Sequence, residues 1–130
     1  MTSYLVDSSV IIDYLRGKEA AVILLDNIKG ELFSSYVCLS ELYEGVYRVE
    51  NSKDLAKIVT KFFGSLSDVY GIDENIARKF GEIRAYLKKK GSVIEDLDIL
   101  LAATCLVYDL TLITFNRKHF SRIPNLRLYP

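Results

Sequence analysis

The chain has 130 residues, enough for one domain that buries a hydrophobic core without disulfides or structural metal. Half of its residues are hydrophobic and 26% are charged, which excludes a disordered tail and is typical of a globular protein. Seventeen basic residues balance seventeen acidic ones, so net charge does not identify a nucleic-acid-binding protein. No apolar run approaches the roughly 20 residues that cross a bilayer, and no signal-like segment precedes the first strand pattern. We therefore expect a single cytoplasmic domain over residues 1–130, with no membrane contact.

The two cysteines, Cys38 and Cys105, lie far apart in sequence, each among apolar residues. No clustered ligands accompany them, which argues against a zinc site. We expect two buried free thiols.

Hydrophobic periodicity and turn residues predict strands that alternate with helices. Such alternation predicts a mainly parallel sheet of four to five strands covered by helices on both faces, a three-layer α/β/α sandwich. In chain order, the predicted elements are a strand at 4–6, helices at 10–15 and 19–28, a strand at 31–34, helices at 39–49 and 52–63, a strand at 68–72, helices at 74–90 and 95–108, a strand at 110–115 and a candidate fifth strand at 126–129.

Small polar residues mark the expected helix starts. Ser8 or Ser9 is the predicted cap of the first helix, Ser52 of the fourth and Asp73 of the fifth. The helix at 95–108 is apolar on nearly all faces, so we expect it to be buried; its start is ambiguous, because Ser92 could form a capping box with Glu95.

Three carboxylates stand where strands end or apolar helices begin. Asp7 follows the first strand, Glu41 lies near the start of the third helix, and Asp98 opens a buried helix. Each has an ordinary explanation: Asp7 as a helix cap, Asp98 as a first-turn acid and Glu41 as an exposed helical residue. A charge in apolar surroundings costs several kcal/mol unless it is compensated, and no Lys or Arg is near any of the three in sequence. The combination favours a divalent cation, Mg²⁺ or Mn²⁺, and metal-dependent phosphoryl chemistry.

Basic residues gather on both sides of the segment that holds Asp98. An ordinary solvated helix face and a basic tail explain them without any ligand. They are Arg78, Lys79, Arg84, Lys88, Lys89 and Lys90 before it, and Arg117, Lys118, His119, Arg122 and Arg127 after it.

Four segments together resemble the PIN-domain proteins, specifically the VapC-type ribonuclease toxins of prokaryotic toxin–antitoxin pairs. The resemblance covers essentially the whole chain in the family's order, and it implies a PIN-like α/β/α sandwich, a Mg²⁺-dependent endoribonuclease acting on RNA, a homodimer and inhibition by a cognate antitoxin. The segments are LVDSSVIIDYL at 5–15, SELYEG at 40–45, DLDILLAA at 96–103 and LITFNRKHF at 112–120.

Position by position, Asp7, Glu41 and Asp98 match the family's first three acidic residues, which the resemblance makes catalytic and metal-binding. Ser9 matches the small polar residue that supports the first Asp. Asp96 lies two positions before Asp98, points away from it on a helix, and is expected to be a cap or a supporting residue.

The fourth acidic position is a departure, because Asn116 and His119 stand where an Asp or Glu is often found. We expect the first three acids to bind one ion well and a second ion to bind weakly without RNA. Arg117 and Lys118 are candidate contacts to RNA phosphates. As a lone histidine, His119 is more often a surface group than a base.

Two other enzyme classes fit poorly. A receiver domain needs an acidic pair after the first strand, and a haloacid-dehalogenase-type phosphatase needs a second Asp where this chain has Ser9. The open alternative is a PIN-like module that binds RNA or protein with a weak or inactive site. For the expected dimer, candidate contact residues are Tyr47, Val49, Phe62 and Phe63, unless they belong to the core.

Overall fold

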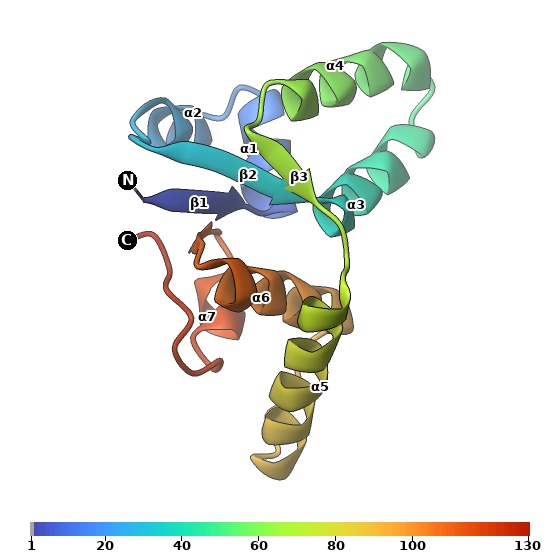
Figure 1. The fold of residues 1–130 in the computed structure, drawn as a ribbon. Helices are drawn as coiled ribbons and strands as arrows, with labels where there is room; N and C mark the ends of the chain where they lie inside the picture. The colour runs from blue at the N-terminus through green and yellow to red at the C-terminus, as the bar shows by residue number, and fades with distance from the viewer. Residues whose placement is uncertain (1) are drawn as a thin grey trace.

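A parallel sheet forms the centre of the protein, for which the computed structural model describes residues 2–130 (Figure 1). Four strands lie in the order β3-β2-β1-β4 and pair in parallel throughout. No helix within residues 2–130 is long and apolar enough to cross a membrane. The strands are β1 (Ser3–Val6), β2 (Glu31–Ser35), β3 (Asp68–Tyr70) and β4 (Thr111–Ile113).

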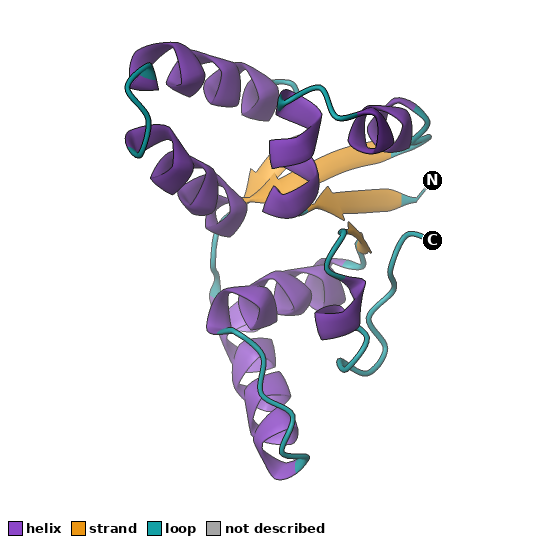
Figure 2. Cartoon of the chain, turned by 180° about the vertical axis from the view of Figure 1, so that it is seen from behind, coloured by secondary structure: helices purple, strands orange, loops and turns teal. Residues whose placement is uncertain are grey.

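Helices cover the sheet, and the chain's path decides which face each helix takes (Figure 2). From β1 to β3 the chain steps across the sheet in one direction, and the return to β4 runs in the other direction. Right-handed crossovers therefore place α1 to α4 on one face and α5 and α6 on the opposite face. The helices are α1 (Ser8–Leu15), α2 (Glu19–Asp26), α3 (Tyr36–Tyr47), α4 (Ser52–Gly64), α5 (Glu74–Lys89), α6 (Asp96–Tyr108) and α7 (Arg117–Phe120).

The apolar helix α6 is the buried helix that the sequence predicts. Ile99, Leu101 and Ala102 are at most 2% exposed, and α6 packs extensively against α5. Both cysteines are free and buried, as expected. Burial of α6 fixes its first turn, which carries Asp98, beside the ends of the strands.

β3 and β4 are shorter than the predicted strands, whereas β1 and β2 are each one residue longer. β3 ends at Tyr70 and β4 spans only Thr111–Ile113, because the apolar runs continue beyond the hydrogen-bonded ladder. The predicted fifth strand is a single parallel bridge between Leu112 and Leu128. The sheet thus has four strands, and the chain leaves it immediately after Ile113.

The helix caps of α1 and α4 differ from the prediction, and the start left open for α6 is settled at Asp96. Asp7, rather than Ser8 or Ser9, caps α1 by accepting the backbone N–H of Val10 at 3.3 Å. Asn51 precedes α4, in place of the predicted Ser52. Glu95 precedes α6 without a side-chain cap hydrogen bond, so no capping box forms.

The prediction for α5 is confirmed: Asp73 accepts the N–H of Ile76 at 2.8 Å. Helix α3 begins three residues earlier than predicted, because Ser35 accepts the N–H of Val37 at 3.0 Å. The short helix α7 is absent from the prediction.

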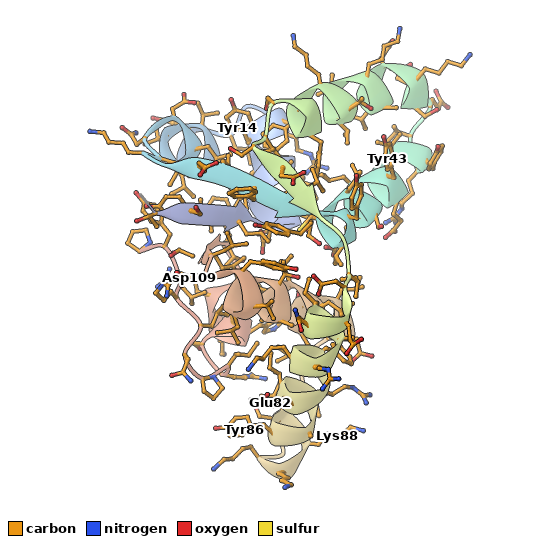
Figure 3. The ribbon with its side chains drawn as sticks, in the orientation of Figure 1. Tyr14, Tyr43, Glu82, Tyr86, Lys88 and Asp109 are labelled. Carbon is orange, nitrogen blue, oxygen red and sulfur yellow. The ribbon has the colours of Figure 1, made fainter. Side chains whose placement is uncertain are left out.

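The candidate dimer residues are divided between surface and core. Tyr47 and Val49 are 79% and 46% exposed, whereas Phe63 is 7% exposed. Phe62 is half-buried, with its ring 5.6 Å from that of Tyr14 (labelled in Figure 3). Phe63 therefore belongs to the core, the alternative that the sequence left open, and is no longer a candidate for the dimer contact.

We predict that Ser35→Ala destabilises the protein by about 1–2 kcal/mol, because it leaves a buried helix-start N–H without its acceptor. Urea unfolding should show a lower midpoint with an unchanged m value. Ser52→Ala is the matched control, since Ser52 is not the cap, and should stay within about 0.5 kcal/mol of the wild type. Equal effects of the two changes would contradict the observed caps.

Candidate active site

The candidate site lies at the crevice expected beyond the carboxyl ends of the neighbouring strands β1 and β4. The connection after β1 leads to α1 on one face of the sheet, and the chain arrives at β4 from α6 on the other face. This is the topological switch point of the sheet, where ligands of open α/β folds bind. Asp7 follows β1 and Thr114 follows β4, so both side chains lie at this position.

The carboxylate of Asp7 is buried and held by donors from two segments. Its Oδ1 accepts from Ser9 Oγ at 2.6 Å and from the Val10 N–H, while Oδ2 accepts from the Thr114 hydroxyl. Ser9 Oγ also accepts the N–H of Phe115 at 3.3 Å. Burial raises the pKa of Asp7 despite these hydrogen bonds, which favour the charged form. The expected contact between Ser9 and Asp7 is present.

Glu41 reaches the crevice from α3. It is half-buried, and Ser8 Oγ donates to its Oε1 at 3.0 Å. Burial raises the pKa of its carboxyl, and the negative charges of Asp98 and Asp7 raise it further. The carboxylates of three separate segments are thus close enough to repel one another.

Asp98 completes the group from the first turn of α6. Burial raises its pKa, the charge of Glu95 adds to this effect, and contact with His119 opposes it. The Nδ1 atom of His119 lies 3.6 Å from Asp98 Oδ2. The sequence favours a surface position for His119, and its side chain is indeed partly exposed, but it also contacts Asp98 of the site.

In the part of the chain that the structure describes, no lysine or arginine forms an ion pair with these three carboxylates. Among the ion pairs of the described residues, none joins a basic side chain other than His119 to Asp7, Glu41 or Asp98. Within residues 2–130, no three or more His, Cys, Asp or Glu side chains are arranged so that they could hold a metal ion. Oxygen donors without a counter-charge nevertheless fit Mg²⁺, which keeps several waters and binds through one or two carboxylates plus substrate phosphates.

The structure places Asp96 away from the crevice. Its Oδ1 pairs with Arg84 Nε at 3.0 Å, and the side chain is 59% exposed. Glu95 occupies the cap position of α6, so Asp96 is not the cap, and no hydrogen bond among residues 2–130 joins it to Asp98. The prediction that the side chains of Asp96 and Asp98 diverge is confirmed, whereas a supporting role for Asp96 has no contact behind it.

Asn116 is connected to the acids indirectly, through hydrogen bonds to Thr114 and His119. Its N–H donates to Thr114 Oγ1 at 2.9 Å, and its Nδ2 is 2.9 Å from His119 Nδ1. Arg117 donates to the Tyr129 carbonyl at 2.9 Å, and the exposed Lys118 follows it on α7.

Many of the other basic side chains are paired with acids. Arg84 forms an ion pair with Asp96. Lys88 lies near the C-terminal end of α5, which extends away from the sheet (Figure 3). These residues match an ordinary solvated surface better than an RNA path. The remaining pairs are Arg78–Glu74, Lys79–Glu82 and Arg127–Asp109.

The sequence predicts no role at the site for three residues that act on its carboxylates: Ser8, Thr114 and Glu95. Two of them carry a usable signal. Thr114 ends a strand that pairs with β1, and Glu95 precedes Asp98 by three residues, a spacing that puts both on one helix face. Ser8 carries no such signal, because its partner Glu41 is 33 residues away.

An apolar groove of about 150 Å³ adjoins Glu41 between α1, α3 and α4. Arg16 and Glu41 are its only charged lining residues among those described. Its apolar walls are Ile12, Leu15, Leu42, Val46, Val49, Leu55 and Val59.

Known proteins share this sequence pattern. The PIN domain profile matches residues 4–126. Ribonuclease VapC1 of Methanocaldococcus jannaschii is 33% identical over 124 residues, which cover 95% of this chain and 83% of the relative. Ribonuclease VapC19 of Mycobacterium tuberculosis is 32% identical over 126 residues, covering 95% of this chain and 96% of the relative.

Solved structures share the fold. VapBC-1 from nontypeable Haemophilus influenzae matches with a TM-score of 0.86 and 26% identity, over 98% of this chain and 97% of the other. DNA-bound VapBC from Salmonella typhimurium matches with a TM-score of 0.89 and 25% identity, over 99% of this chain and 98% of the other.

We predict that metal-free Asp98→Asn is more stable than the wild type at pH 7 and equal to it near the ordinary Asp pKa of 3.8. The raised pKa of Asp98 means that its carboxyl contributes stability below the unfolded-state value and loses it as pH rises through the folded-state pKa. Urea midpoints measured with chelator across this range test the prediction. Asp96→Asn, which only loses the pair with Arg84, should not gain stability. A wild type more stable than Asp98→Asn at pH 7 would refute the repulsion.

Proposed function

The chain belongs to the PIN-domain family and, within it, to the VapC proteins, and on this basis we propose that it is a divalent-metal-dependent endoribonuclease. The observation that carries the proposal is the meeting of Asp7, Glu41 and Asp98, from three segments, at one crevice without a lysine or arginine partner. The relatives named as ribonucleases supply the reaction class, and cleavage adds water across a phosphodiester bond of RNA.

Asp7, Glu41 and Asp98 would supply the one or two carboxylates that bind Mg²⁺ or Mn²⁺ directly, with waters and substrate phosphate as the other ligands. When bound, the ion neutralises charge on the phosphate oxygens and lowers the pKa of water at the site. Asp7 presents its carboxylate in a fixed orientation, because the Ser9, Val10 and Thr114 donors leave it little freedom. That preorganisation avoids an entropy cost when substrate arrives.

Glu41 and Asp98 approach the crevice from α3 and α6. Ser8 orients Glu41, and the burial of α6 fixes the backbone of Asp98. Lys118 is exposed on α7, next in sequence to His119, and is our candidate for a phosphate contact. Arg117 is a weaker candidate, because its guanidinium already donates to Tyr129.

As a cellular role, we propose the toxin of a toxin–antitoxin pair that acts in the cytoplasm. The support is the similarity to VapC chains from VapBC complexes. The apolar groove beside Glu41 would suit an apolar segment of a cognate antitoxin, whose burial there removes apolar surface from water.

A catalytically weak or inactive PIN-like module that binds RNA or protein is the second candidate. Asn116 in place of an acid and the lack of a three-ligand arrangement within residues 2–130 favour it. The retention of all three other acids favours the enzyme. A cleavage assay separates the two, because only an enzyme produces new RNA ends.

We predict that Asp7→Asn and Asp98→Asn each abolish metal-dependent RNA cleavage while the fold is retained. Each change removes one metal-binding charge and keeps the size of the side chain. The assay is gel analysis of RNA incubated with purified protein and Mg²⁺, with a chelator control. Asp96→Asn is the matched control in the same helix turn and should keep wild-type activity. Full activity of the Asp98→Asn protein would exclude the proposed site.

We also predict a homodimer that uses the exposed Tyr47 and Val49. Sedimentation equilibrium at micromolar concentration should give twice the mass of the chain. Tyr47→Glu should shift the equilibrium towards monomer, because it would bury a charge at an apolar contact. Ile23→Glu, at a 53% exposed position on α2, is the control and should leave the mass unchanged. A monomeric wild type would contradict the prediction.

A further inference from the structure

The only histidine of the chain lies against the candidate metal-binding acids. His119 Nδ1 is 3.6 Å from Asp98 Oδ2 and 2.9 Å from Asn116 Nδ2, and the imidazole is 43% exposed. The Asn116 N–H donates to Thr114, whose hydroxyl donates to Asp7. His119 is therefore joined at one side to Asp98 and at the other, through two residues, to Asp7.

The hydrogen-bond pattern defines which atom of the imidazole faces the crevice. In the tautomer with its proton on Nε2, Nδ1 accepts from the Asn116 amide, and its lone pair is on the side of Asp98. Two electron-rich atoms, Nδ1 of His119 and Oδ2 of Asp98, then lie 3.6 Å apart. Ligand bonds of about 2.0–2.2 Å to one ion put neighbouring donor atoms roughly 3–4 Å apart, so the observed spacing suits a shared cation.

We propose that His119 is a nitrogen ligand of the divalent ion at Asp98 and takes the place of the acid that is missing at Asn116. This inference rests on the proposed metal-dependent function. It requires only that Asn116 gives up its hydrogen bond to Nδ1 when the ion binds. Waters and substrate phosphates complete the ion's shell, in agreement with the small number of protein ligands.

A nitrogen ligand changes which metal the site prefers. Mg²⁺ favours oxygen donors, whereas imidazole suits the transition metals, and affinity for nitrogen-containing sites rises beyond Mn²⁺ along the first row. The site should therefore prefer Mn²⁺ to Mg²⁺ more strongly than a site of carboxylates alone. The competing explanation is that a protonated His119 is only an ion-pair partner of Asp98, in which case no nitrogen touches the metal.

Pulsed electron paramagnetic resonance of bound Mn²⁺ distinguishes these explanations, because it detects the ¹⁴N nucleus of a coordinated imidazole. The full chain, prepared without a polyhistidine tag and freed of metal, has one histidine, so an imidazole signal identifies His119. We expect the ¹⁴N coupling in the wild type and its loss in His119→Gln. The coupling should persist in Lys118→Gln, a neighbouring control on α7.

Calorimetric titration gives a second measurement that needs no activity. His119→Asp should bind Mg²⁺ at least as tightly as the wild type, and the ratio of its Mg²⁺ and Mn²⁺ dissociation constants should fall about tenfold. An unchanged ratio would overturn the proposal. Circular dichroism of the variants verifies that the fold is retained.

The outcomes separate this inference from the proposed function. Bound Mn²⁺ without ¹⁴N coupling overturns the role of His119 and leaves metal-dependent cleavage standing. Coupling without RNA cleavage supports the role of His119 and overturns the endoribonuclease. A spectrum of free Mn²⁺ alone at millimolar concentration overturns both.

Discussion

A buried negative charge at the end of β1 is the constraint on which much of the site depends. Asp7 caps α1, so moving its side chain away would leave the backbone N–H of Val10 without an acceptor. Its two oxygens need donors, which come from Ser9 and from Thr114, 107 residues away. The pairing of β4 with β1 brings Thr114 to this position, so the pairing of the two strands supplies a donor to the carboxylate. The arrangement of the candidate site therefore depends on the pairing of these two strands.

The other two acids add repulsion that the fold does not relieve by itself. Glu41 and Asp98 are carried by helices whose positions are set by packing, and each has its pKa raised by burial and by neighbouring carboxylates. A structure optimised for stability alone would replace one of them with a neutral or basic residue. Retaining three acids is reasonable if a cation is present during function, because the ion converts mutual repulsion into attraction. Stability in the metal-free state is then partly given up for binding.

The sequence predicts those features that depend on local patterns. Asp73 as a helix cap, the buried helix with Asp98 at its start, and the parallel strands all follow from periodicity and residue type within a few positions. It fails where several local choices are equivalent. Ser8 and Ser9 are both good caps by type, but their hydroxyls bind Glu41 and Asp7, so the cap passes to the acid itself. The extent of a strand is likewise decided by its partner and not by its own apolar run.

In the segment after β4, the prediction from the local sequence differs most from the observed contacts. As a sequence, residues 114–120 read as an apolar strand end followed by an ordinary basic loop. In the structure, Thr114 binds Asp7, Asn116 binds Thr114 and His119, and His119 faces Asp98. The contacts among Thr114, Asn116 and His119 are local, but the series begins at Asp7, after β1, and ends at Asp98, on α6. One turn of α7 therefore brings the imidazole of His119 beside Asp98, within three residues of Asn116. The residue type at position 116 alone therefore does not describe which donor atoms lie on this side of the site, because the backbone turn after it decides where the next side chains go.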